Sequence, residues 1–249
     1  MGMTLAEAHV RGFEVAGHHT ARFVAYVRAL TEDEVALPVP GLTWTVGQTV
    51  THVQSVYERY TVDRRRADTA DLVAVANEED VARIGVGLEA SARSIEEQWA
   101  FLGAVVGSVP PDTEFPFHAG LQTTMAGGWG NLLGELLAHG DDLARATGKP
   151  FGVPGEDLEV TWRFGFPLLS GWLRPEARGL VETWRLQMPF GDIGLVLDRG
   201  VFDVIDDPAG ADHDLEVGDV EELTLQVPYR RREAGDPLVE LLGSRFRDL

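Results

Sequence analysis

The spacing of the apolar residues changes near residue 150, and this change is the strongest constraint on the fold. Before it, apolar side chains recur every three or four positions in long runs separated by Pro and Gly, which is the pattern of amphipathic helices. The pattern predicts helices over residues 4–30, 45–66, 78–106 and 129–147. Helices of this length bury their apolar stripes only against one another, so residues 1–150 are predicted to form a four-helix bundle.

Local signals mark the ends of these helices. Thr45 and Gln48 fit a capping box at the start of the second helix. Gly148 and Pro150 follow the fourth helix, where glycine and proline commonly end a helix. Residues 114–121, between the third and fourth helices, are expected to be extended.

After residue 150 the apolar runs are shorter. We expect a helix over residues 158–173, interrupted by Pro167, and a terminal helix over residues 237–245. Strands are predicted over residues 180–188, 193–197, 201–205 and 223–227. The second predicted domain, residues 151–249, is therefore a small α+β unit that follows the bundle.

The charge of the chain excludes some classes of partner. Asp and Glu number 40 against 21 Lys and Arg, which gives a formal net charge of −19. A field of this sign repels phosphate backbones and anionic lipid, so roles in binding nucleic acid or a membrane surface are disfavoured. Lys149 is the only lysine, and the arginine-rich composition indicates a GC-rich genome.

The chain contains no cysteine. This excludes disulfides, zinc fingers, iron–sulfur ligation and a thiol nucleophile of the protein's own, so any metal site must use His, Asp and Glu. The first residues lack the basic and apolar regions of a secretory signal, and no run approaches the ~18 apolar residues of a membrane span. We therefore expect a cytoplasmic protein.

Three side chains form a candidate metal site. Glu135 and His139 are spaced i,i+4 on the fourth predicted helix and so share one face. His52 lies inside the second helix, whose interior face meets the fourth in a bundle. Together they predict a two-histidine, one-carboxylate site with open positions, typical of a catalytic metal. The alternatives are a solvated Glu/His face and a hydrogen-bonded core histidine. Asp142, one turn beyond His139, is either a carboxylate that orients the imidazole or a surface acid.

The other histidines suggest less. His18 and His19 are expected on the outer face of the first helix. His213 is expected in a solvated acidic loop, and no role is assigned to His118.

Two stretches resemble the mycothiol-dependent maleylpyruvate isomerase family, within the wider superfamily of DinB-like metal-binding bundles. Residues 44–53, WTVGQTVTHV, are similar to its helix-two signature, and residues 134–148, GELLAHGDDLARATG, to its helix-four signature. Both occur in the family's order and at a sensible separation. Residues from about 155 onward resemble, more diffusely, the family's sterol-carrier-like C-terminal domain.

The resemblance implies a site and a chemistry. The family's metal ligands fall on His52, Glu135 and His139; the metal is typically zinc, and the cofactor is mycothiol, a thiol of actinobacteria. Family members often carry Trp where this chain has Asp141. Their arginines bind a dicarboxylate substrate, and no clear motif locates these arginines here. The candidates are Arg83, Arg230, Arg231, Arg232 and Arg245. We predict Arg83 and Arg245 as catalytic; a surface or ion-pair role is the alternative for each.

These observations predict a zinc enzyme that activates mycothiol as a thiolate, for S-transfer to a small electrophile or for its thiol-assisted isomerisation. Two alternatives stay open. One is a non-catalytic small-molecule or lipid-binding protein with a vestigial or structural metal. The other is a thiol-independent metal hydrolase. The expected partners are a thiol and an electrophile, without nucleic acid or membrane, and the chain is expected to be a monomer or a homodimer.

Overall fold

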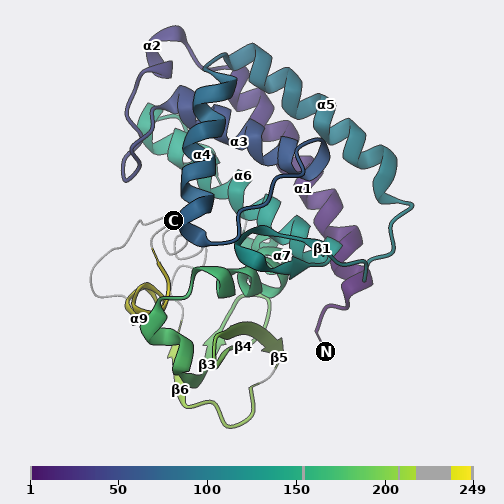
Figure 1. Cartoon of the computed structure of the whole chain (residues 1–249), viewed down its shortest axis with the longest axis vertical. Helices are drawn as coiled ribbons and strands as arrows, with labels where there is room; N and C mark the ends of the chain where they lie inside the picture. The colour runs from purple at the N-terminus through teal and green to yellow at the C-terminus, as the bar shows by residue number, and fades with distance from the viewer. Residues whose placement is uncertain (1, 153–154, 207, 217–236, 248–249) are drawn as a thin grey trace.

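A computed structural model describes residues 2–152, 155–206, 208–216 and 237–247 (Figure 1). Its larger part is a bundle of the long helices α1 (Leu5–Arg28), α3 (Val46–Thr61), α5 (Leu88–Val106) and α6 (Met125–Thr147). Helix α1 packs on α6, α6 on α3, α3 on α5 and α5 on α1, which closes the ring of four. The predicted bundle is confirmed.

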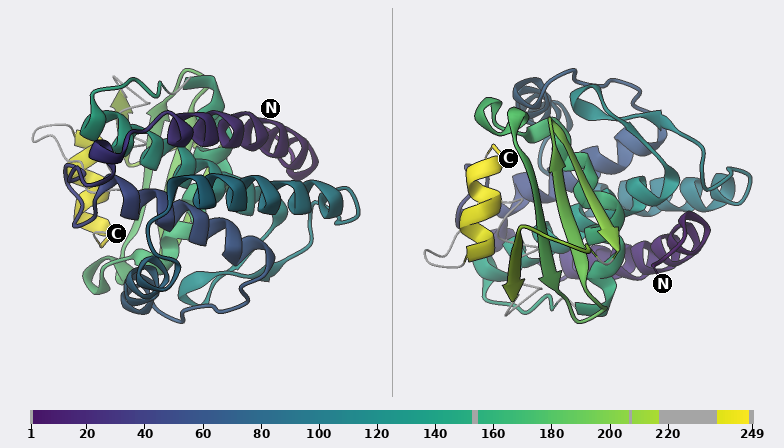
Figure 2. Two further views of the ribbon diagram at one scale, coloured as in Figure 1. Left: turned by 90° about the horizontal axis from the view of Figure 1, so that it is seen from above. Right: turned by 90° about the horizontal axis from the view of Figure 1, so that it is seen from below.

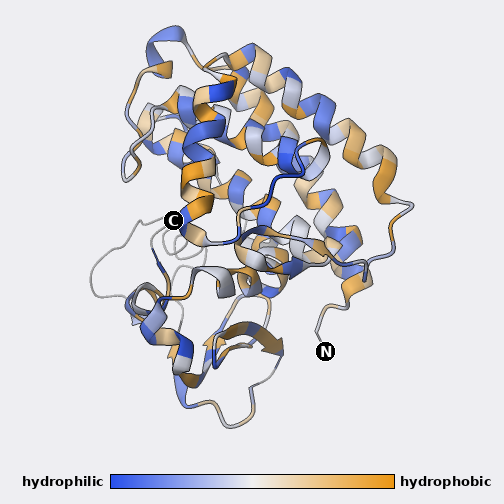
Figure 3. Ribbon diagram, viewed as in Figure 1, coloured by the Kyte–Doolittle hydropathy of each residue, from blue (hydrophilic) through white to orange (hydrophobic). Residues whose placement is uncertain are grey.

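The bundle helices begin and end where the side chains satisfy the backbone. Thr45 and Gln48 form the capping box expected at the start of α3. Thr124 caps α6, and Gly148 ends it in the left-handed conformation. Hydrophilic and hydrophobic residues are interspersed around these helices (Figure 3), as expected of helices with one buried face.

Two predicted boundaries are wrong. The single helix expected over residues 78–106 is two helices, α4 (Ala70–Ile84) and α5, separated at Gly85, whose φ of 75° is available to glycine at no steric cost. Helix α3 ends at Thr61, so residues 62–66 belong to a loop and not to the helix. Helix α4 packs against α3 outside the ring of four. A short helix, α2 (Glu32–Val35), precedes α3.

Between α5 and α6 the chain forms a hairpin whose two strands have two residues each. Strand β1 (Phe115–Pro116) pairs with β2 (Gln122–Thr123), and the turn of 3-10 helix at His118–Gly120 lies between them. The segment expected to be extended is therefore extended only at its ends.

The predicted helix over residues 158–173 is a continuous but irregular helical run. It begins as α7 (Leu158–Val160), widens to a π-helix over Thr161–Gly165 and tightens to 3-10 helix over Phe166–Trp172. The chain then enters a four-stranded sheet in the order β5-β4-β3-β6. Its strands are β3 (Val181–Gln187), β4 (Ile193–Asp198), β5 (Val201–Asp206) and β6 (His213–Glu216).

The sheet is mixed. Strands β3, β4 and β5 are antiparallel neighbours, whereas β6 runs parallel to β3, with Trp184 opposite His213. The prediction that His213 lies in a loop is wrong, because the residue takes part in this pairing. The terminal helix α9 (Pro237–Arg245) is confirmed, whereas the strand predicted over residues 223–227 lies outside the described residues.

The bundle and the C-terminal part share one hydrophobic core. The run 158–172 lies between α6 and the sheet. The sheet itself lies below the bundle in the view of Figure 1 and in front of it in the right-hand view of Figure 2. Gly130 on α6 and Gly165 are in backbone contact, since a Cβ built on Gly130 would lie 2.5 Å from the Gly165 nitrogen. The domain boundary at residue 150 stays a prediction. Among the described residues, no helix is long and apolar enough to cross a membrane.

Candidate functional site

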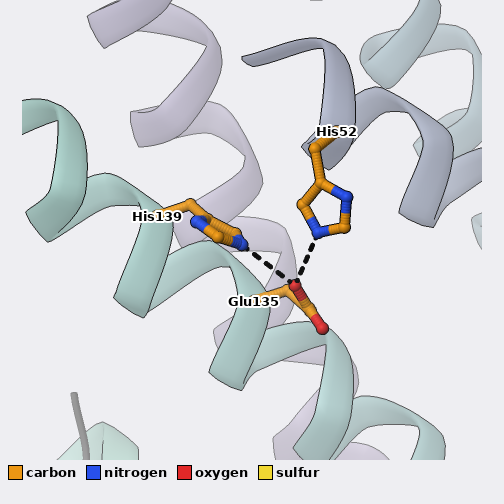
Figure 4. Close-up of side chains that lie close together, drawn as sticks. All are labelled: His52, Glu135 and His139. Carbon is orange, nitrogen blue, oxygen red and sulfur yellow. Dashed lines mark hydrogen bonds and ion pairs between the residues drawn. The ribbon is translucent and has the colours of Figure 1, made fainter. Parts of the chain in front are cut away.

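The structure brings His52, Glu135 and His139 together inside the bundle (Figure 4). His52 projects from α3, while Glu135 and His139 project from successive turns of α6. Glu135 Oε2 lies 3.4 Å from His52 Nε2 and 3.3 Å from His139 Nε2. The two imidazole rings are 4.9 Å apart, centroid to centroid, and nearly perpendicular. One atom from each residue therefore points to a common centre.

The donor set and its dimensions fit a metal ion. Tetrahedral coordination with metal–ligand bonds of about 2.0–2.1 Å separates neighbouring ligand atoms by roughly 3.4 Å. The two histidine-to-glutamate separations match this edge, and all three ligand atoms lie within 4.8 Å of one another. Two imidazoles and one carboxylate fill three positions and leave at least one for an exogenous ligand.

The protonation states also suit a metal. Burial lowers the pKa of His52 to about 4, despite the opposing contact with Glu135, so its imidazole is neutral near pH 7. Burial raises the pKa of Glu135, but the hydrogen bonds and charges of His139 and His52 outweigh this and hold its pKa below the ordinary value. A neutral imidazole and an ionised carboxylate are the forms that bind metals.

A second carboxylate orients one of the imidazoles. His139 Nδ1 lies 2.8 Å from Asp142 Oδ2, and the Asp142 side chain is fully buried. Of the two roles predicted for Asp142, the structure therefore has the orienting contact. The second nitrogen of His52, Nδ1, is also buried, and no hydrogen-bond partner for it occurs among the residues that the structure describes.

A cavity of about 220 Å³ opens beside the three side chains. Helices α3, α4 and α6, the β1–β2 hairpin and the helical run 158–172 all contribute to its wall. Much of that wall is aromatic: Trp44, Tyr60, Phe115, Phe117, Phe166 and Trp172. The cavity therefore presents an apolar surface next to the candidate metal ligands, as small-molecule sites commonly do.

Polar side chains also line the cavity at positions that the sequence analysis did not single out for a role. Among them are Arg59, Arg66, His118 and Thr161. Three come from loops or from the irregular run after residue 158, where no periodic pattern indicates which way a side chain faces. The only available signals were the run of arginines at residues 64–66 and a histidine followed by Ala-Gly.

The predicted arginines lie elsewhere. Arg83 donates to Glu58 and Asp80, at 2.9 and 3.2 Å. Arg245 forms a double hydrogen bond with Glu182. Neither is among the residues that line the cavity, and their catalytic role stays a prediction. Residues 230–232 lie outside the described residues.

One of the two neighbouring histidines on α1 departs from expectation. His18 is exposed as expected, but His19 is fully buried and its Nε2 lies 2.8 Å from Asp157. The prediction of a surface residue is wrong because the chain after α6 returns to cover this face of α1.

Comparisons with known proteins agree with this architecture. Residues 16–144, slightly more than half of the chain, match the family model described as the mycothiol maleylpyruvate isomerase N-terminal domain. The chain is also similar in fold to a solved structure entitled "Crystal structure of the mycothiol-dependent maleylpyruvate isomerase". The TM-score is 0.54 at 16% sequence identity, over 93% of this chain and 91% of that one.

A search of curated proteins found no match. The family match covers α3 and nearly all of α6, and so includes His52, Glu135 and His139. The protein belongs to the family that carries the mycothiol maleylpyruvate isomerase N-terminal domain.

Proposed function

We propose that this protein is a metal- and mycothiol-dependent enzyme that isomerises a small electrophile or transfers the thiol to it. The observation that carries the proposal is the convergence of His52, Glu135 and His139 on one point beside the aromatic cavity. Membership of an isomerase family supports the thiol dependence. The partners required are a thiol and a small electrophile, and we expect both to be met in the cytoplasm.

The three ligand residues would hold a divalent metal, and the donor set suits zinc. When bound, zinc and mycothiol together supply a nucleophilic sulfur near neutral pH, because coordination lowers the pKa of a thiol from about 8.5. Asp142 would accept a hydrogen bond from Nδ1–H of His139, which leaves the lone pair of Nε2 to bind the ion. The aromatic walls of the cavity place an apolar surface beside these ligands.

Metal analysis of the purified full-length chain tests the proposal. We expect about one zinc per chain in the wild type, and almost none in His52→Ala or His139→Ala. His18→Ala is the matched control, because this histidine is exposed and does not line the cavity, so its loss should leave the metal content unchanged. Absence of metal from carefully purified wild-type protein would overturn the proposal.

A thiol titration of the cobalt-substituted protein separates the enzyme from the alternatives. We expect mycothiol to change the visible spectrum of cobalt, since sulfur would enter its coordination sphere. A bound metal whose spectrum no thiol changes would instead indicate a small-molecule or lipid-binding protein. Substrate turnover without any thiol would indicate a metal hydrolase.

A further inference from the structure

Arg66 forms no ion pair within the described part of the chain, and the carboxylate whose charge acts on it, that of Asp63, is itself paired with Arg65. Its guanidinium donates four hydrogen bonds, and every acceptor is a backbone carbonyl oxygen. These acceptors belong to Arg59, Asp63, Arg65 and Pro116. A guanidinium has five N–H groups, so one N–H remains to donate to a ligand. Arg66 is half-buried and lines the cavity.

The other cavity arginine shows the contrast. Arg59 donates from two nitrogens to Asp80 and from a third to Asn77, and Asp80 is almost fully buried. Arg59 is therefore held in a buried ion pair, with Asp80 shared between it, Arg65 and Arg83. Buried charges are normally paired, so a half-buried guanidinium without an ion pair indicates a place for an anion.

His118 is held beside Arg66 by backbone contacts. Arg66 Nε donates to Pro116 O, and the next residue, Ala67, donates its N–H to His118 Nδ1 at 3.2 Å. The backbone N–H of Ala119 in turn donates a hydrogen bond to the carbonyl oxygen of Ala67, with an N···O distance of 2.7 Å. These three bonds join the loop after α3 to the β1–β2 hairpin. They bring the imidazole next to the backbone of the arginine.

The same contacts determine the tautomer of His118. Because Nδ1 accepts the Ala67 N–H, the proton of the neutral imidazole is on Nε2. Burial and the charges of Arg59 and Arg66 lower the pKa of His118 to about 4, so the neutral form is present near pH 7. His118 lines the cavity, and no described residue accepts a hydrogen bond from Nε2. The ring therefore has an N–H to donate.

The backbone at this point is strained. Ala119 has φ 56° and ψ 30°, a left-handed conformation that is unfavourable for alanine. A Cβ built on Gly171 would lie only 2.5 Å from the Ala119 Cβ. The turn is therefore packed closely against the helical run 158–172. Strained residues held by their surroundings cluster at functional sites.

A third polar group comes from the C-terminal wall of the cavity. Thr161 is almost fully buried, and its Oγ1 has no hydrogen-bond partner among the described residues. It begins the π-helix, a distortion that is frequent at functional sites. An unpartnered buried hydroxyl is costly unless a ligand or water satisfies it.

We infer that Arg66 and His118, with the Thr161 hydroxyl, bind a carboxylate of the electrophile, whose apolar part packs on the aromatic wall. One N–H from each of Arg66 and His118 suits the two oxygens of a carboxylate. The inference rests on the proposed function for the identity of the ligand as substrate. It explains how a chain with a net charge of −19 admits an anion.

Benzoate and its neutral analogue benzamide test this inference by calorimetric titration of the zinc-loaded full-length protein. We expect benzoate to bind at least about ten-fold more tightly than benzamide, because only benzoate carries the charge. Arg66→Leu should weaken benzoate binding about ten- to a hundred-fold and remove the preference. Arg64→Leu is the matched control, since Arg64 is exposed and does not line the cavity.

His118 provides an independent pair of variants if Arg66→Leu does not fold. His118→Leu should weaken benzoate binding about ten-fold, and His118→Gln should recover most of it by restoring an N–H at the position of Nε2. Thr161→Val should have a smaller effect in the same direction.

Cobalt substitution shows which end of the cavity the carboxylate occupies. We expect benzoate to leave the cobalt spectrum unchanged. A benzoate-induced change that persists in Arg66→Leu would overturn the inference, as would equal binding of benzoate and benzamide or no binding of either by folded wild-type protein. The proposed function fails separately, if benzoate binds as expected but no thiol changes the cobalt spectrum.

Discussion

The cavity wall carries two polar groups of residues, here named its metal-ligand end and its cationic end, and they are built in different ways. At the metal-ligand end, His52, Glu135 and His139 project from two long helices that pack within the bundle. At the cationic end, Arg66 and His118 project from a loop and from the β1–β2 hairpin, which are joined by two hydrogen bonds between side chain and backbone and by one between backbone groups. At the metal-ligand end, the i,i+4 spacing of Glu135 and His139 can be seen in the sequence. The cationic end exists only where two loops meet.

The difference also affects how each end should tolerate change. A helix holds its side chains through many backbone hydrogen bonds, so loss of one ligand residue leaves the other two in position. The loop end depends on a few contacts around Ala67 and Ala119. The predictions below test whether the two ends are as separate as their construction suggests.

Loss of the shared carboxylate should have the largest effect. Glu135→Gln removes the charge that both imidazoles face, and we expect it to reduce metal affinity by more than the about 10–100-fold typical of an outer carboxylate. Benzoate binding at Arg66 should change little. Competition with a chromogenic chelator measures the first quantity and calorimetry the second. A large loss of both metal affinity and benzoate affinity would show that the two ends depend on each other.

Separation of α6 from the helical run that follows it should destabilise the whole fold. In Gly130→Ala the new Cβ would meet the Gly165 backbone at 2.5 Å, and backbone atoms cannot move aside as a flexible side chain can. We expect a loss of about 3 kcal/mol in the free energy of unfolding. Urea denaturation measures it. Gly107→Ala is the control, because nothing lies within 4 Å of a Cβ there; an equal loss in both variants would contradict the steric argument.

Removal of the orienting carboxylate should act on the metal-ligand end alone. In Asp142→Asn the contact to His139 Nδ1 loses its charge, and we expect metal affinity to fall about 10–100-fold. Asp141→Asn is the neighbouring control, since that carboxylate pairs with Arg145 at the surface. Unchanged affinity in Asp142→Asn would show that the contact does not orient the ligand.

The smallest effect is expected from the pH dependence of stability. The pKa of His118 is lowered from 6.5 to about 4 in the folded protein. As pH falls from about 6.5 to about 4, the unfolded chain therefore takes up a proton that the folded chain does not, and stability decreases; above that window the contribution is constant. His118→Gln should reduce this loss by about 2 kcal/mol.

Denaturation of metal-free protein at about pH 7 and about pH 4.5 measures the difference. The buried His52 shifts in the same direction, so part of the dependence should persist in the variant. An unchanged pH dependence in His118→Gln would show that this imidazole is solvated.

Where the sequence analysis succeeded, it relied on helical periodicity. The i,i+4 pair on α6 and the capped start of α3 are local features, and they located His52, Glu135 and His139. Where it failed, the decisive contacts join residues far apart in the chain. His19 was predicted to be exposed, because Asp157, which covers it, lies 138 residues away.

The predicted arginines illustrate the same limit. Arg83 and Arg66 cannot be distinguished by composition or spacing, because the sequence does not show which hydrogen-bond acceptors each arginine will face. In the folded chain Arg83 faces Glu58 and Asp80, whereas Arg66 faces backbone carbonyls and the cavity. Which arginine remains without an ion pair depends on the acceptors that the fold provides.

The sequence by itself determined the helical bundle, the two histidines and one carboxylate of its candidate metal site, and the exclusion of any thiol from the protein itself. The bundle and the exclusion follow from period and composition, and the candidate ligands from their spacing together with the resemblance of two stretches to a known family; all are properties of the chain before it folds. The tertiary structure alone decided which polar side chains surround the cavity. Their positions depend on loop conformations and on the close contact of Gly130 with Gly165, which no local pattern specifies.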